Sequence, residues 1–410
     1  MTAVENWHPR IDSVANCLLA WHSRSLFFRG RQFVLNALAL ARIWYVAALI
    51  PVPQWVICGF SHLAFSFFWG GKRDLVCRDA VVQPHGSGGF RAVSVPFKVW
   101  TLHVKWVRHF FTSFLCWMQF VFYYCREAFG SWPGVVLLRP YLFDLSSLPP
   151  FYRGLLSAWV AAEGSFSATR ESLIMGSFSC ESPIAVAKAT TTSVYSLHVA
   201  NHSTVPNCVR HFAPLLGALY WHSTWDQLFW FPLDRPVIDL AWLILHGLLH
   251  TAHRLVITFS MVDVPLACFC SPAVSEMLDH PFFYCPLAQS ILSWLQALMH
   301  RCFALVLSLA CRRVLFGFNQ DELLCVPRIF DYMQNVCKFF LWQAGYDYRF
   351  CDVAPIAADL LAKGWVRVQF HLPLFFKCFL SAHRRRFYFR QWGACGVVAS
   401  VVDGHLVVHL

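Results

Sequence analysis

The sequence predicts a mostly α-helical protein, and three observations support this. Apolar residues recur with helical spacing near the start, where one helix face would carry Ile11, Val14, Ala15, Leu18 and Leu19. Prolines and glycine pairs divide much of the chain into helix-length apolar stretches. Pieces that favour strands are short. A chain of 410 residues is long enough for two or three domains, each with its own core.

The first part of the chain predicts a helical domain with a small β-hairpin. Helices are expected at about 9–23, 31–50, 53–69, 96–110 and on to about 125. Pro51 and Pro53 should separate the second helix from the third, which Gly70–Gly71 should end. Val81–Val82 and Ala92–Val95 flank the glycine-rich turn His85–Gly89, which predicts the hairpin.

Four regions are expected along the chain. Residues 1–130 form the helical domain with the hairpin, and 131–215 form a linker that is rich first in proline and then in serine and threonine. Residues 216–350 form a second helical domain, in which a Cys/His-containing insert interrupts apolar helices. Residues 351–410 form a basic, aromatic C-terminal region.

The composition also fits a multi-pass membrane protein. Hydrophobic residues make up 57% of the chain and charged residues 13%, whereas soluble domains average roughly 45–50% and about 25%. Candidate spans lie near 43–69, 110–125, 237–252 and 302–316. The first contains Pro51, Pro53, Gln54 and His62, which need unusual partners in lipid. We therefore favour a protein without membrane spans.

Positive charge is concentrated at the two ends of the chain. Residues 1–110 hold 12 Lys/Arg and 4 Asp/Glu, and residues 361–402 hold 7 Lys/Arg and no acid. Basic ends around a near-neutral middle fit contact with a polyanion such as RNA or single-stranded DNA. Basic cytoplasmic loops of a membrane protein would give the same pattern.

The 17 cysteines lie mostly within apolar runs and no secretory signal precedes them, which predicts reduced thiols in the nucleus or cytoplasm. Four residues have metal-ligand chemistry at close spacing: Cys268, Cys270, His280 and Cys285. Thiolate and imidazole suit tetrahedral Zn²⁺, and His-x4-Cys matches half of a zinc knuckle. Cys-x-Cys and the nine-residue gap depart from the usual spacing. Three alternatives therefore stay open: Cys268 is unused, a remote histidine such as His250 completes the set, or the four residues simply pack a helical core.

Two blocks of the sequence resemble LINE-type (non-LTR) retrotransposon reverse transcriptases. The first resembles the thumb and carries Asn6–Trp7, Trp21, Gly30–Arg31, Asn36–Leu40, Tyr45, Phe67–Trp69, Lys72, Gln83–Pro84 and Gly88–Phe90. The second resembles the zinc-binding C-terminal domain and carries Trp242–Leu255, Cys268, Cys270, His280–Pro286, Trp294, Leu315–Gly317, Lys338 and Trp342.

The resemblance implies a non-catalytic, nucleic-acid-binding part of such an enzyme. The paired aspartates that hold Mg²⁺ in the polymerase palm have no counterpart, so we expect no Mg²⁺ site and no polymerase activity from this chain alone. A palm domain would come from upstream. Thumb-like phosphate contacts are expected at Arg24, Arg29, Arg31, Lys72, Arg73 and Arg78.

The C-terminal region contains a second candidate for nucleic-acid contact. Arginines that pair with phosphate alternate there with aromatic rings that stack on bases, at Arg384, Arg385, Arg386, Phe387, Tyr388 and Arg390. The same run fits a nuclear-import signal or a solvated basic surface. The sequence thus predicts an RNA-clamping fragment, with a membrane protein or a degenerate retroelement remnant as alternatives.

Overall fold

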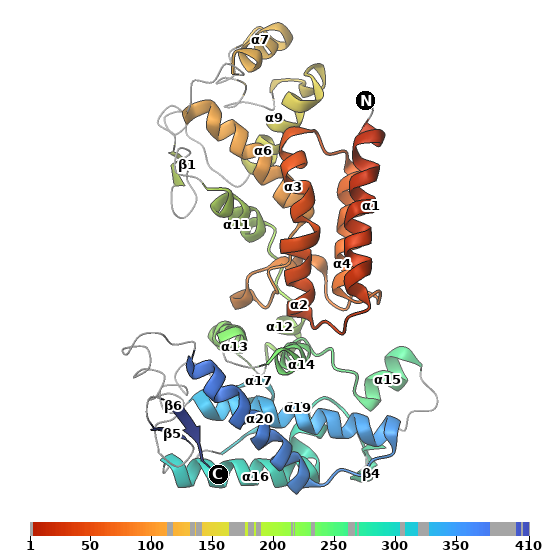
Figure 1. Ribbon diagram of the computed structural model, residues 1–410, viewed down its shortest axis with the longest axis vertical. Helices are drawn as coiled ribbons and strands as arrows, with labels where there is room; N and C mark the ends of the chain where they lie inside the picture. The colour runs from red at the N-terminus through yellow and green to blue at the C-terminus, as the bar shows by residue number, and fades with distance from the viewer. Residues whose placement is uncertain are drawn as a thin grey trace. The chain divides into compact units, whose positions relative to one another are not determined.

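The protein is mostly α-helical, as the sequence predicts (Figure 1). The computed structural model describes residues 3–112, 118–131, 136, 142–163, 177–178, 184–185, 190–214, 216, 218–230, 234–260, 267–268, 270–303, 308–318, 328–377, 399–402 and 405–409. The chain forms two compact units. Unit 1 contains residues 1–84 and 89–204, and unit 2 contains residues 85–88 and 205–410.

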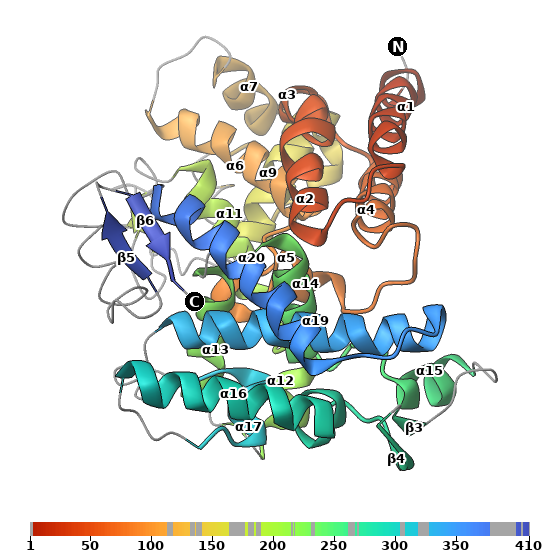
Figure 2. The ribbon, with the colours of Figure 1, turned by 60° about the horizontal axis from the view of Figure 1, so that its bottom comes forward.

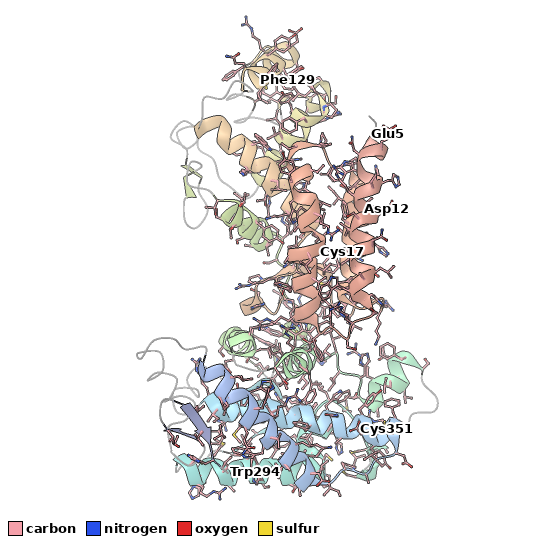
Figure 3. All side chains as sticks on the ribbon, viewed as in Figure 1. Glu5, Asp12, Cys17, Phe129, Trp294 and Cys351 are labelled. Carbon is pink, nitrogen blue, oxygen red and sulfur yellow. The ribbon has the colours of Figure 1, made fainter. Side chains whose placement is uncertain are left out.

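Unit 1 begins with helices that lie lengthwise beside one another (Figure 1). They are α1 (Ala3–His22), α2 (Phe28–Phe33), the π-helix η1 (Val34–Ala39), α3 (Ala41–Leu49) and α4 (Gln54–Phe68). Figure 3 labels Glu5, Asp12 and Cys17 along α1. Trp7 on α1 is fully buried, contacts Phe60 edge-on and donates its indole N–H to the Pro51 carbonyl at 3.2 Å. This packing fixes α1 against α4.

The proline-containing break is where the sequence predicts it. α3 ends at Leu49 and α4 begins at Gln54, because Pro51 and Pro53 cannot continue a helix. No single helix among the described residues has the length and apolar composition of a membrane span. One helix pair bent by 44°, Phe28–Ala39 with Ala41–Leu49, meets that criterion by length and composition alone.

The prediction of a β-hairpin in residues 76–95 is wrong, because the structure has no strands there. Its first arm forms the short helix α5 (Arg78–Val82) and its turn is the 3-10 helix η2 (His85–Ser87). The chain still doubles back, because the amide of Phe90 donates to the Val81 carbonyl at 2.9 Å. Val81 is fully buried, so packing overrides the strand preference of its branched side chain.

The predicted linker contributes to the core of unit 1. Its described part contains the 3-10 helix η4 (Leu145–Ser147), α9 (Pro150–Glu163) and α11 (Thr191–Asn201), and α9 and α11 pack on α6 (Val95–Thr112). Trp159 and Val194 lie in one buried cluster with Val104. Thr190 and Ser193 form a capping box at the start of α11, which explains why a Ser/Thr-rich stretch is helical. α7 (Met118–Phe129) and the short strands β1 (Ser177–Phe178) and β2 (Ile184–Ala185) complete unit 1.

Unit 2 is built around three long helices that pack on one another (Figure 2). They are α16 (Pro286–Phe303), α19 (Arg328–Cys351) and α20 (Ala357–Lys377). Figure 3 labels Trp294 on α16 and Cys351 at the end of α19. The shorter helices are α12 (Asn207–Phe212), α13 (Ala218–Trp230), α14 (Arg235–Leu245), α15 (Ala252–Phe259) and α17 (Cys311–Phe316). The antiparallel strand pairs are β3 (Ala267–Cys268) with β4 (Ser271–Ser275), and β5 (Ala399–Val402) with β6 (His405–Val408).

Residues 85–88 complete the core of unit 2. The Gly88 carbonyl accepts hydrogen bonds from Trp242 Nε1 at 2.9 Å and from His246 Nε2 at 3.1 Å. Since Nε2 carries the proton, Nδ1 of His246 accepts from the Cys208 thiol at 3.5 Å. Burial lowers the pKa of His246 to about 4, which keeps the ring neutral. His246 is therefore a satisfied core histidine.

Candidate metal centre and basic residues

The candidate metal ligands come from the β3–β4 pair with its turn and from η6 with the residue that follows it. Cys268 ends β3, and the β3–β4 pairing is irregular between Ala267 and Cys268. Cys285 lies between the π-helix η6 (His280–Tyr284) and α16, where it adopts an extended conformation. Pro281 and Pro286 lie in the first turns of η6 and α16, positions that suit proline because its missing N–H has no helical partner there.

The thiols of Cys268, Cys270 and Cys285 form one cluster. Cys285 Sγ lies 3.2 Å from Cys270 Sγ and 3.8 Å from Cys268 Sγ, and all three atoms lie within 4.8 Å of one another. Sulfur ligands of a tetrahedral metal, with bonds of about 2.3 Å, are themselves about 3.8 Å apart. Cys268 and Cys285 are buried and Cys270 is half-buried. The cluster could therefore hold a metal ion.

Proton sharing within the cluster favours one thiolate. The hydrogen bond with Cys268 is the largest cause that lowers the pKa of Cys285, to about 5. The same bond raises the pKa of Cys268, and burial raises the pKa of Cys270 to about 12. A thiolate is the form of cysteine that binds metals. Here the Cys285 thiolate is stabilised by hydrogen bonds from the neighbouring thiols.

His280, the fourth predicted ligand, does not join the three thiols in this structure. It is buried, and its Nε2 atom has no hydrogen-bond partner among the described residues. It lies close enough to the Glu276 carboxylate to affect the pKa of that group. His250, the alternative imidazole, contacts Phe259 instead and is outside the thiol cluster. The described residues thus supply three converging ligands, and His280 keeps an unsatisfied buried nitrogen.

A buried ion pair supports the segment between β4 and η6. Arg349 on α19 donates to Glu276 Oε1 at 2.6 Å, and both side chains are almost fully buried. The same carboxylate accepts the amide of Ala252 at the start of α15 at 3.3 Å. Burial raises the pKa of Glu276, against the opposite effect of Arg349. No local sequence pattern predicts this pair, because 73 residues separate its members.

Half of the predicted thumb-like cations have partners within unit 1. Arg31 donates to the Phe68 carbonyl at 2.9 Å and so satisfies the end of α4. Arg78 pairs with Asp74 at 2.8 Å, and the guanidinium of Arg24 lies 4.5 Å from the centre of the Trp21 ring. These contacts show structural uses for side chains that the sequence assigns to phosphate binding.

The other three predicted cations of this set, Arg29, Lys72 and Arg73, are exposed. The loops after α1 and α4 adjoin, because a Cβ on Gly71 would lie 3.7 Å from His22 Nε2. Lys72 and Arg73 follow the C-terminus of α4, where the helix dipole favours cations, so their position alone does not require a ligand. Arg29 lies in the first turn of α2, where the dipole gives no such stabilisation. The C-terminal set of Arg384, Arg385, Arg386, Phe387, Tyr388 and Arg390 lies outside the described residues.

Part of the chain is similar to a transposon protein. It is 25% identical over 143 residues to the Transposon TX1 uncharacterized 149 kDa protein of Xenopus laevis. The aligned stretch covers 33% of this chain but 11% of the frog protein, so the chain spans a small part of that relative's length. No protein-family model matches the chain.

Proposed function

We propose that the chain is a nucleic-acid-binding, non-catalytic C-terminal portion of a LINE-type retrotransposon reverse transcriptase, folded around a structural zinc ion. The observation that carries this proposal is the convergence of Cys268, Cys270 and Cys285, at positions quoted for the family resemblance. The similarity to a transposon protein supports a retroelement origin. The chain would bind RNA or single-stranded DNA in the nucleus or the cytoplasm.

Zinc would be held by the three thiolates, with His280 as the candidate fourth ligand. The ion would supply a rigid junction between β3, η6 and α16, which needs no open coordination position. His280 fits this role because its buried Nε2 has no other partner among the described residues. The ligand set contains no aspartate, so it does not suit Mg²⁺.

The nucleic acid would be bound through its phosphates. Arg29, Lys72 and Arg73 are exposed and offer charge-assisted contacts that do not depend on base sequence. The chain would clamp a template or primer next to a polymerase palm supplied from upstream, and it would not extend a primer by itself. Binding should therefore weaken steadily with salt.

Metal analysis of the purified full chain tests the zinc centre. We expect about one zinc per chain, loss of that zinc in Cys285→Ala, and reduced thermal stability after chelation. Cys337→Ala, which changes a half-buried cysteine outside the cluster, is the control and should keep its zinc. Full zinc content in Cys285→Ala would exclude the proposed ligand set.

Filter binding of RNA and single-stranded DNA across a salt series tests the partner. We expect the triple variant Arg29→Gln, Lys72→Gln, Arg73→Gln to lose affinity and to lower the salt slope by about 2 to 3. Arg78→Gln is the matched control, because Arg78 already pairs with Asp74. Absence of binding at low salt, or binding without a salt slope, would contradict the proposal.

A further inference from the structure

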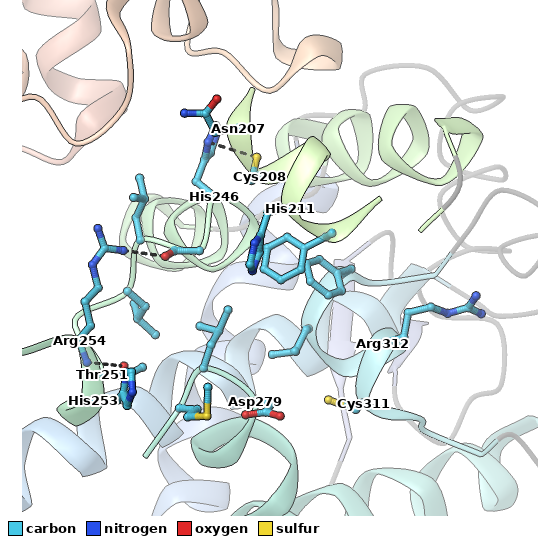
Figure 4. Close-up of a pocket in the computed structure, with 18 of the residues that line it drawn as sticks. Asn207, Cys208, His211, His246, Thr251, His253, Arg254, Asp279, Cys311 and Arg312 are labelled. Carbon is cyan, nitrogen blue, oxygen red and sulfur yellow. Dashed lines mark hydrogen bonds between the residues drawn. The ribbon is translucent and has the colours of Figure 1, made fainter. Parts of the chain in front are cut away.

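Unit 2 contains a cavity of about 900 Å³, which is within the size range of ligand pockets (Figure 4). Its walls come from α12, the end of α14, the start of α15, η6 and α17, and they include the rings of Phe212, Phe316 and Tyr284. Arg254 and Arg312 line opposite sides in Figure 4, and Asp279 is the acidic residue of the lining. The cavity therefore combines apolar walls with a net positive charge.

Arg254 is the part of the lining that points to a ligand. Its Nη1 atom donates to the Gly247 carbonyl at 2.6 Å, which fixes the guanidinium beside the cavity. Burial lowers the pKa of Arg254, and no carboxylate among the described residues forms an ion pair with it. A partly buried guanidinium without an ion-pair partner can bind an anion with little further loss of hydration. The remaining guanidinium donors match a phosphate.

The aromatic residues of the cavity suit a planar group. His211 and Phe212 meet edge-on with ring centres 4.6 Å apart, and Phe212 also packs edge-on against Phe316 with ring centres 4.9 Å apart. Tyr284 is 57% exposed, although it lies next to the buried thiol cluster. A cavity lined by both exposed or half-buried rings and a cation has the residue types that bind unpaired bases.

We propose that this cavity holds one nucleotide of a single strand, with its phosphate on Arg254 and its base against Phe212 and Tyr284. This inference rests on the proposed nucleic-acid binding and adds a specific site to it. Cys208 and His246 also line the cavity, but the Cys208 thiol donates to His246 Nδ1, and His246 Nε2 donates to the Gly88 carbonyl. They therefore shape the wall and do not recognise the ligand.

Fluorescence anisotropy with the zinc-loaded full chain tests the site. The probes are a fluorescein-labelled oligo(dT) of ten nucleotides and the same backbone without bases. We expect the base-bearing probe to bind about tenfold tighter, because stacking contributes per base. Arg254→Gln should weaken it about tenfold and Arg254→Lys less, whereas Arg301→Gln, on the exposed face of α16, should change it less than twofold.

Photocrosslinking of unmodified protein to an oligonucleotide that contains 5-iodouracil gives a readout that does not depend on the variants folding. Crosslinks to peptides with Phe212 or Tyr284 support the pocket. The pocket proposal fails if crosslinks are confined to other peptides, or if Arg254→Gln and Arg301→Gln bind the probe with equal affinity. Either result leaves the proposed nucleic-acid binding of the chain unaffected. Failure of both probes to bind at low salt overturns both. If free dTMP competes with an affinity equal to that of the oligonucleotide, the pocket binds a nucleotide as proposed, and its ligand is a free nucleotide.

Discussion

Gly88 shows how much a single residue can determine in this protein. Its φ of +84° lies in the left-handed region, and a Cβ there would come within 2.9 Å of the Trp225 ring. Its carbonyl is the shared acceptor for Trp242 and His246. The position therefore needs glycine both for its backbone conformation and for the close approach of the indole.

We expect Gly88→Ala to reduce the free energy of unfolding by about 2–4 kcal/mol, from backbone strain and overpacking together. Gly247→Ala is the comparison, because Gly247 also has a positive φ, of +64°, but its Cβ would meet Phe212 at an ordinary 3.6 Å. That variant should lose roughly 1 kcal/mol. Urea unfolding followed by tryptophan fluorescence measures both, and equal losses would contradict the steric argument.

Asp331 is a buried acid whose protonation should affect stability. Burial, the largest cause, raises its pKa from 3.8 to about 6, and nearby Lys338 and Arg328 partly oppose that shift. Its Oδ1 atom has no hydrogen-bond partner among the described residues. Because the folded chain binds this proton more tightly than the unfolded chain, its contribution to stability is full below about pH 4 and is lost as the pH rises through about 6.

The free energy of unfolding of the wild type, relative to Asp331→Asn, should therefore fall on the order of 2 kcal/mol between pH 4 and 7. Chemical denaturation of both proteins at each pH gives this difference directly. Asp359→Asn, in the first turn of α20 and exposed, provides the background slope. A difference that rises with pH would show that Asp331 is ionised and stabilising.

At the scale of elements, α19 organises unit 2. It packs against α14, α16, α20 and η6, and it carries Arg349, which reaches Glu276 beside the candidate metal centre. α20 is fixed in turn by Arg367, which donates to Asp234 at the start of α14 at 2.6 Å and lies over the Phe339 ring. Side-chain bonds between elements thus hold the helices in register around the thiol cluster.

Breaking the buried pair should be far more costly than breaking an exposed one. We expect Arg349→Met to destabilise the chain by about 3–5 kcal/mol, because it leaves the Glu276 carboxylate buried without its partner. Arg78→Met, which removes the exposed pair with Asp74, should cost less than about 1 kcal/mol. Thermal unfolding of the two variants compares them. Similar losses would mean that Glu276 is protonated or reaches solvent.

At the scale of the whole molecule, unit 2 is discontinuous in sequence. Residues 85–88 belong to it, although the chain on both sides of them belongs to unit 1. η2 places His85 on Phe229 with ring centres 3.8 Å apart, and Gly88 on Trp225 and Trp242. A fragment of residues 205–410 would therefore lack part of its own core.

We expect the 205–410 fragment to aggregate or to unfold at lower denaturant concentration than unit 2 in the full chain. A peptide of residues 76–95, added in excess, should bind it and raise its stability by mass action. The Gly88→Ala peptide is the matched control and should have a weaker effect. Equal stability of the fragment with and without the peptide would show that residues 85–88 contribute little to unit 2.

The sequence by itself determined the helical class and the break at Pro51 and Pro53, because periodicity and proline geometry are local properties. It also indicated the cluster of Cys268, Cys270 and Cys285, because these cysteines are close together in the chain. Only the tertiary structure decided that 76–95 is not a hairpin, that α9 and α11 belong to a core and that Arg31 and Arg78 have internal partners. The same holds for the ion pair of Glu276 with Arg349 and for the cavity at Arg254. Each of these features depends on contacts between residues that are far apart in the chain. The folded arrangement is selected by burial of apolar side chains and by pairing of buried polar groups, and neither is encoded in a local sequence pattern.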